Sequence, residues 1–161
     1  MRLVSAILLA LSFTALGRAA SVNELRVVRR DGSATTVKEL VGDRPAVVAF
    51  WATYCAPCRA EVPVLNRALE KWGTQGLRVV GVAIEPDDKS VREAAEEWGI
   101  KYDVVVVEGG QQELIDKLFP HGLPASATIA GDKTTLDHKL LDDAALEKRV
   151  PPLFEKAPPP P

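Results

Sequence analysis

The sequence of 161 residues contains only two cysteines and two histidines, which limits the chemistry open to it. A small scaffold stapled by disulfides needs several cysteine pairs spread along the chain. A structural zinc ion needs four ligands, and the spacing of His121 and His138 is not that of a metal-binding pair. We therefore expect no metal and no cofactor. The pair Cys55 and Cys58 forms either a redox centre or a small local disulfide.

An excess of positive charge is also missing. The chain has 20 basic and 22 acidic residues, a net charge of −2, and no basic stripe interleaved with aromatic residues. Nucleic acid is therefore not an expected partner. The proportions of hydrophobic (47%) and charged (26%) residues are typical of a soluble globular domain, and a chain of this length can bury a core without staples.

The first residues have the pattern of a secretory signal. Arg2 precedes an uncharged, mostly apolar stretch (residues 3–16), and Gly17 and Ala19 then supply small residues at the −3 and −1 positions of a cleavage site after Ala19 or Ala20. This stretch is shorter than the roughly 20 residues that span a bilayer, so we expect cleavage, with an uncleaved anchor as the alternative. The mature protein is then expected in the periplasm or another extracytoplasmic space, where disulfides persist.

The pattern divides the chain into a signal peptide (1–20), one domain (21–156) and a proline tail (157–161) that is expected to be disordered. We expect the domain to be monomeric. Strands are predicted at 24–30, 33–37, 46–51, 77–84, 104–107, 126–129 and 134–140, and helices at 59–72, 88–98, 111–119 and 142–149. Pro151 and Pro152 are expected to stop the last helix. Alternating strands and helices predict an α/β fold with a mixed central sheet flanked by helices.

The chemistry-bearing motif is Cys55-Ala56-Pro57-Cys58, which lies between an apolar strand and a helix. A thiol at a helix N-terminus faces unpaired backbone N–H groups and the positive end of the helix dipole, and both favour the thiolate. Cys55 is the outer residue and is expected to attack, while Cys58 resolves the mixed disulfide. Pro57 suits the first helical turn, where a missing N–H costs nothing.

Two segments carry a resemblance to a known family. The first is Phe50-Trp51-Ala52-x-x-Cys55-x-Pro57-Cys58-Arg59-x-Glu61-x-Pro63, and the second is Gly122-Leu123-Pro124-Ala125-Ser126. Together with the order of elements from about 45 to 149, they resemble the thioredoxin superfamily, and within it the TlpA/ResA-like branch of exported reductants.

The resemblance implies a thioredoxin-like fold with an N-terminal β-hairpin and one extra strand–helix insertion. It implies a thiol–disulfide oxidoreductase that reduces disulfides in exported proteins, with electrons from a membrane-embedded thiol donor. Cytochrome c maturation is the best-known setting of this branch, which makes apocytochrome c or another metalloprotein-assembly client a candidate substrate. Leu123-Pro124 is expected to be a cis peptide bond opposite the dithiol. The residues expected to bind substrate are Trp51, Tyr54, Ala56, Pro57, Leu123 and Pro124.

The sequence departs from the family pattern at two positions. Leu123 stands where Thr or Val is usual, so the rim of the site lacks a hydroxyl. Ala49 stands where cytoplasmic thioredoxins carry a buried Asp, so the proton acceptor for Cys58 must come from elsewhere. Glu85 is our candidate, because it follows the strand at 77–84 and should lie at the same sheet edge as Cys55. The competing interpretation is a solvated loop acid.

Three further interpretations remain open to test. A peroxidase of the peroxiredoxin type needs Pro-x-x-x-Thr/Ser-x-x-Cys, but the corresponding positions hold Val48 and Ala52. A non-enzymatic binding or chaperone module would tolerate loss of a cysteine or of the loop proline, and neither is lost. Arg59 and Glu61 are expected to form a solvated helix face.

Overall fold

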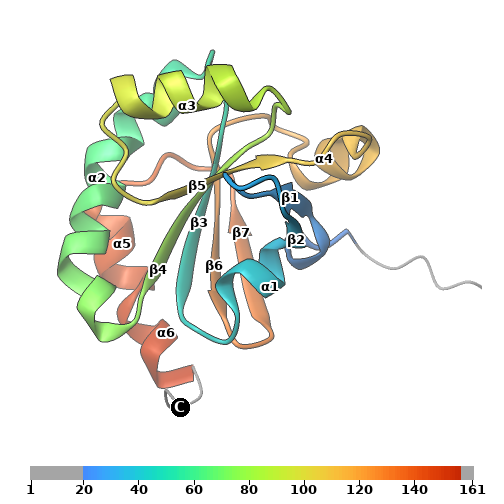
Figure 1. Cartoon of the computed structure of the whole chain (residues 1–161). Helices are drawn as coiled ribbons and strands as arrows, with labels where there is room; N and C mark the ends of the chain where they lie inside the picture. The colour runs from blue at the N-terminus through green and yellow to red at the C-terminus, as the bar shows by residue number, and fades with distance from the viewer. Residues whose placement is uncertain (1–19, 157–161) are drawn as a thin grey trace, which may run out of the picture.

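A computed structural model describes residues 20–156, which form one curved sheet with helices on both faces (Figure 1). The expected signal peptide (1–20) lies outside the described residues except for its last residue, and the expected proline tail (157–161) also lies outside them. None of the helices in the described range is long and apolar enough to span a membrane.

Seven strands form the sheet, in the order β2-β1-β5-β4-β3-β6-β7. They are β1 (Arg26–Val28), β2 (Ala34–Thr36), β3 (Ala46–Trp51), β4 (Arg78–Ala83), β5 (Asp103–Val107), β6 (Ala125–Ala130) and β7 (Lys133–Asp137). β3, β4 and β5 are parallel, whereas β6 is antiparallel to β3, and the β1–β2 and β6–β7 hairpins are antiparallel. The expected mixed sheet is confirmed.

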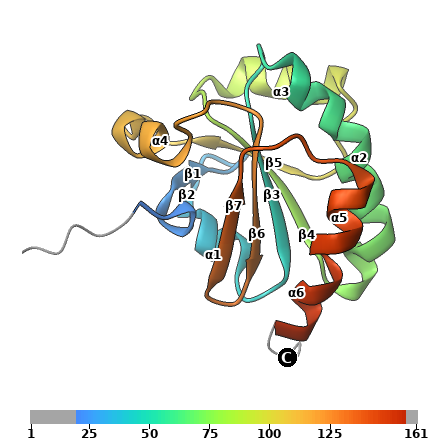
Figure 2. The same ribbon diagram turned by 180° about the vertical axis from the view of Figure 1, so that it is seen from behind.

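The central strand β3 is buried along its whole length, as its unbroken apolar run predicts for a strand covered on both faces. One face packs against α1 (Val37–Val41) and α4 (Gln112–Leu118). The other face packs against α2 (Ala56–Trp72), α3 (Asp88–Glu97), α5 (Asp143–Arg149) and α6 (Pro151–Lys156). Figure 2 shows the sheet and the helices on its two faces from behind. Short 3-10 turns lie at Val22–Glu24 and Gly73–Gln75.

The N-terminal hairpin ends sooner than the sequence predicted, because α1 replaces the end of the second strand. The Thr36 side chain accepts a hydrogen bond from the Glu39 N–H, and the Glu39 carboxylate accepts one from the Thr36 N–H. This reciprocal pair is a capping box, which starts a helix at Val37. Val37, Leu40 and Val41 are buried beneath the sheet as a result.

The helix predicted at 142–149 ends before Pro151 and Pro152, as expected. The expectation that it is the last helix was wrong, because α6 begins at Pro151 itself. Proline suits the first turn of a helix because its missing N–H would have no intrahelical partner there. Leu153 is buried in the core beneath α2, so α6 is a packed part of the domain.

Candidate active site

The two cysteines lie at the connection between the end of β3 and the start of α2, at the carboxyl edge of the parallel strands. Cys55 is the N-cap of α2, and its Sγ accepts a hydrogen bond from the Cys58 N–H at 3.3 Å. The two residues form a disulfide. Pro57 occupies the first turn of the helix, as the sequence predicted. The helix N-terminus therefore directs a backbone donor at the sulfur of Cys55, which is the geometry that stabilises a thiolate.

The disulfide is almost covered, but its surroundings are open. Cys55 is 6% exposed and Cys58 3%, with the Cys58 Sγ 3.9 Å from the Phe50 carbonyl oxygen. Tyr54 is 75% exposed, and Ala56 and Pro57 are also at the surface. Cys55 is thus the more exposed of the two cysteines by a small margin, and the residue before it carries an exposed aromatic ring.

The loop before β6 also packs against the two cysteines. The Leu123–Pro124 peptide bond is cis, as expected. β6 begins at Ala125, which pairs with Phe50 of β3, so the loop lies beside the end of the strand that leads to the cysteines. The Leu123 side chain is half-buried and packs against the cluster that contains both cysteines. The structure thus brings the two sequence segments together.

Glu85 lies at the same edge of the sheet, as parallel pairing of β3 and β4 predicted. Trp51 pairs with Ala83, two residues before Glu85. The Glu85 Oε1 accepts a hydrogen bond from the Thr53 N–H at 2.6 Å. This carboxylate is half-buried and is tied to the segment that carries Cys55, so it is not a free loop acid. Whether it exchanges protons with Cys58 stays a prediction.

Glu61 is the functional candidate that sequence reasoning missed. Its expected place on a solvated helix face was wrong, because the side chain is 1% exposed. Its Oε1 accepts a hydrogen bond from the Leu141 N–H at 2.5 Å. Burial raises the pKa of Glu61 to about 7, although the hydrogen bond from Leu141 works in the opposite direction.

The signal for Glu61 was present in the spacing of the helix. Cys58, Glu61 and Leu65 follow one another at three and four residues, so they share the buried face of α2. Burial raises the pKa of Tyr102, and the charge of Glu61 adds to the rise, which places the two groups near each other. A buried acid one turn after Cys58 can take up the proton that Cys58 must lose.

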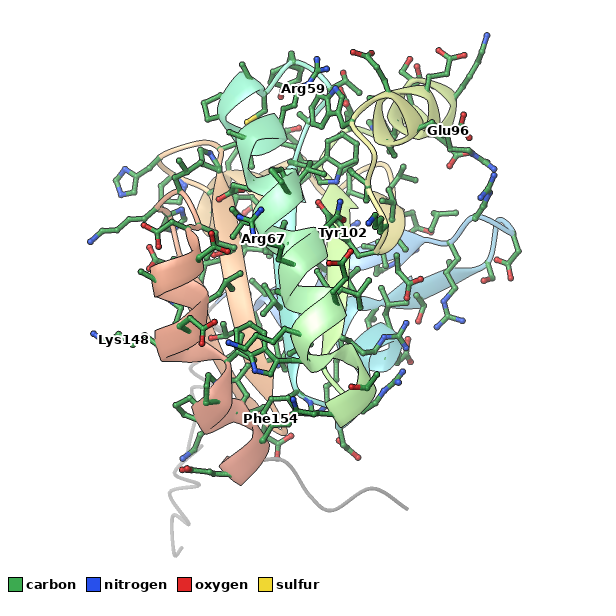
Figure 3. All side chains as sticks on the ribbon, turned by 90° about the vertical axis from the view of Figure 1, so that its left-hand side faces the viewer. Arg59, Arg67, Glu96, Tyr102, Lys148 and Phe154 are labelled. Atoms are coloured by element: carbon green, nitrogen blue, oxygen red, sulfur yellow. A yellow bond between two sulfur atoms is a disulfide. The ribbon has the colours of Figure 1, made fainter. Side chains whose placement is uncertain are left out.

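Two other sequence expectations have different outcomes. Arg59 is exposed, pairs with Glu97 at 3.1 Å and lies over the ring of Trp98, as a solvated position allows (Figure 3). Trp51, expected among the substrate-binding residues, is a core residue that is only 3% exposed. Its ring packs against Trp98 with the centroids 5.0 Å apart, so it supports the site from behind.

The sequence profile of the AhpC/TSA family matches residues 16–117, which is more than half of the chain. The chain therefore belongs to the AhpC/TSA family. The matched range contains the dithiol, both glutamates and the parallel strands that bring them together.

Curated relatives include "Thiol-disulfide oxidoreductase ResA" of Bacillus thuringiensis (strain Al Hakam), which is 28% identical over 102 residues. The match covers 63% of this chain and 57% of that relative, so the chain spans little more than half of its length.

Solved structures show the same fold. The thioredoxin domain of a thiol-disulfide oxidoreductase from Bacteroides vulgatus superposes with a TM-score of 0.69 at 20% identity, covering 83% of this chain and 98% of that one. A putative thiol:disulfide interchange protein DsbE from Chlorobium tepidum gives a TM-score of 0.68 at 21% identity, covering 87% and 99%. The fold is therefore thioredoxin-like, as the sequence resemblance implied.

Proposed function

We propose that this chain is an extracytoplasmic thiol–disulfide oxidoreductase that reduces disulfides in exported proteins. The observation that carries the proposal is the Cys55–Cys58 pair at the N-terminus of α2, next to the loop of Leu123 and Pro124. The names of the curated relatives support the reaction type. The signal-like N-terminal sequence supports the location.

The reaction consists of two exchange steps. The Cys55 thiolate attacks one sulfur of the client disulfide, so the client S–S bond breaks and a mixed disulfide with Cys55 forms. The released client thiolate takes a proton from solvent. Cys58 then loses its proton, attacks the Cys55 sulfur and closes the intramolecular disulfide, which releases the second client thiolate. Two electrons pass to the client, and a thiol donor must return them to the Cys55–Cys58 disulfide.

We assign to Glu61 the role of accepting the proton that Cys58 loses. It is buried one turn further along the same helix face, and its pKa near 7 lets it change protonation at physiological pH. Glu85 remains our alternative for this step. Its hydrogen bond to the Thr53 N–H fits a second role, in which it positions the segment that presents Cys55.

Client binding is assigned to the open surface around the disulfide. The residues that offer side chains or backbone there are Tyr54, Ala56, Pro57, Leu123 and Pro124. The donor is a membrane-embedded thiol protein, and the client is an exported protein such as apocytochrome c or another metalloprotein-assembly client. The protein acts as a monomer.

The competing functions are a peroxidase and a non-enzymatic binding module. Stopped-flow measurements separate all three: the reduced protein is mixed with a protein disulfide or with hydrogen peroxide, and the return of the disulfide is followed by tryptophan fluorescence. We expect fast oxidation by the protein disulfide, slow oxidation by peroxide, and neither in Cys55→Ser. Faster oxidation by peroxide would favour the peroxidase, and no oxidation by either would favour the binding module.

A further inference from the structure

The ionised form of Glu61 depends on a loop that is distant in the sequence. This loop (residues 138–142) connects the end of β7 to the start of α5, and its Leu141 N–H donates to the Glu61 Oε1 at 2.5 Å. The titratable neighbours of Glu61 are Cys58 on its own helix and Tyr102 before β5, and the described chain shows no ion pair to Glu61. Burial raises the pKa of Glu61, and within the described chain the Leu141 N–H is the one group that lowers it.

The orientation of the Leu141 N–H depends on how the chain enters the loop. The Leu141 side chain is 2% exposed and is held in the core. Its N–H, however, belongs to the peptide group that it shares with Leu140, which is 51% exposed. The contacts that hold the first half of the loop therefore decide where this N–H points.

The ionisable side chains of the loop contact other groups or solvent. The His138 ring packs edge-on against the ring of His121 with the centroids 5.5 Å apart, and Lys139 is exposed. Asp142 accepts a hydrogen bond from the Ala145 N–H at 2.7 Å and so caps α5. These side chains therefore do not hold the carboxylate of Glu61 in place of the Leu141 N–H.

Asp137, the last residue of β7, anchors the entry to the loop. Its Oδ1 accepts a hydrogen bond from the Lys139 N–H at 3.0 Å, and its Oδ2 pairs with the guanidinium of Arg149, the last residue of α5. The two side chains of this ion pair are 26% and 27% exposed, whereas every other ion pair between described residues has a partner that is 42% exposed or more. A pair sheltered from solvent holds its geometry better than a solvated one.

α5 is itself fixed on the helix that carries Glu61. The Arg67 guanidinium of α2 donates to the two carboxylate oxygens of Asp143 at 3.0 and 2.7 Å. Figure 3 shows α5, on which Lys148 is labelled, alongside α2, on which Arg67 is labelled. Arg149 thus has a fixed place relative to Glu61, from which it reaches back to the entry of the loop.

We propose that Arg149 is a positioning residue, which acts through Asp137 and the loop to keep the Leu141 N–H on the carboxylate of Glu61. Without this anchor the first half of the loop is free to turn the N–H away, and Glu61 then keeps its proton up to a higher pH. The effect on Glu61 is independent of the redox function. Its consequence for the exchange reaction rests on the role proposed above for Glu61.

The titration of Glu61 tests the proposal directly. The full-length oxidised protein, in which Cys58 cannot titrate, is labelled at the carboxyl carbons of glutamate, and the Glu61 signal is followed by NMR as the pH is varied. In Arg149→Ala we expect the midpoint to move to higher pH, with proton binding about tenfold tighter, because the carboxylate has lost one hydrogen bond. Arg149→Lys keeps a cation for Asp137 and should stay close to the wild type.

Two further variants separate the hydrogen bond from the effect of charge. Asp137→Asn keeps an oxygen acceptor for the Lys139 N–H but loses the ion pair. Loss of a negative charge alone would move the midpoint of Glu61 to lower pH, so movement to higher pH in this variant identifies the lost hydrogen bond. Lys148→Ala is the matched control, because it removes an exposed cation from the same helical turn as Arg149, and it should leave the midpoint unchanged.

The rate at which the mixed disulfide is resolved gives the second readout. In Arg149→Ala this step should be about fivefold slower than in the wild type at pH 7 and equal to it at pH 9, because the ionised fraction of Glu61 differs only around the midpoint. A merely structural defect would slow the step at every pH.

The outcomes for the two readouts are distinct. The proposal is overturned if the midpoint does not rise in Asp137→Asn, which is the milder change and decides the matter if Arg149→Ala does not fold. It is also overturned if Lys148→Ala moves the midpoint as far as Arg149→Ala does. A midpoint that moves without the matching change in the rate profile upholds the positioning role of Arg149 and removes Glu61 from the exchange reaction.

Discussion

The carboxylate of Glu61 accepts a hydrogen bond from the backbone N–H of Leu141 at 2.5 Å, which links the start of α2 to the loop before α5. Within residues 20–156 it is the one hydrogen bond that this carboxyl group forms, and the side chain is 1% exposed and lies one turn after Cys58. The free energy of burying this carboxyl group therefore depends on pH more strongly than that of a surface acid does.

Glu61→Gln should make the protein more stable at pH 8 and remove part of its pH dependence. The folded-state pKa is about 7, above the ordinary value of 4.5, so the folded state holds a proton that the unfolded state has lost. The stability this proton contributes is complete below about pH 4.5 and is lost as the pH rises through 7. The free energy of unfolding is therefore about 3 kcal/mol lower above pH 7 than below pH 4.5. Urea unfolding of both proteins between pH 4.5 and pH 8 measures it.

Glu70→Gln is the matched control on the same helix, because Glu70 is exposed and pairs with Lys101 at the surface. It should change the free energy of unfolding by less than about 1 kcal/mol at any pH. If the free energy of unfolding of Glu61→Gln at pH 8 is no higher than that of the wild type, the ionised Glu61 carboxylate does not destabilise the folded protein.

The two glutamates should affect the exchange reaction in different ways. If Glu61 accepts the proton of Cys58, Glu61→Gln slows the resolution of the mixed disulfide and flattens its pH dependence near 7. Glu85→Gln keeps an acceptor oxygen for the Thr53 N–H, so positioning should survive and the pH profile should keep its shape. Single-turnover rates from pH 5 to pH 9 give both profiles. A flattened profile in Glu85→Gln alone would transfer the proton role to Glu85.

Gly81→Ala should destabilise the protein by about 1–3 kcal/mol, because the core behind the dithiol has no room for a methyl group. A Cβ at this position would lie 3.0 Å from the Trp51 Nε1 and 3.0 Å from the Tyr102 Cε2. Gly109→Ala is the control, since a Cβ there meets nothing within 4 Å. Equal free energies of unfolding for the two variants would show that Trp51 and Tyr102 are free to move apart.

Much of the site could be predicted from the sequence because its position follows from strand direction. The sequence predicts strands at 46–51 and 77–84, and parallel pairing of the two then places Glu85 at the same sheet edge as Cys55. Glu61 could not be assigned in the same way. Charged residues are usually exposed, and the hydrogen bond that compensates the burial of this one comes from Leu141, which is 80 residues away in the sequence.

The errors in the fold have local causes. Val37 has high strand propensity, but the capping box that Thr36 forms with Glu39 makes it the first residue of a helix. Pro151 was interpreted as a stop, although a proline can equally be the first residue of a new helix.

The central claim is that Cys55 attacks and Cys58 resolves, and trapping tests it most directly. Reduced Cys58→Ser is mixed with a protein disulfide, and the products are separated without reductant and identified by mass spectrometry. The account predicts a stable mixed disulfide on Cys55 in this variant, and almost none in Cys55→Ser, where the remaining thiol is 3% exposed in the wild type. A mixed disulfide that forms on Cys58 as fast as on Cys55, or on neither residue, would contradict it.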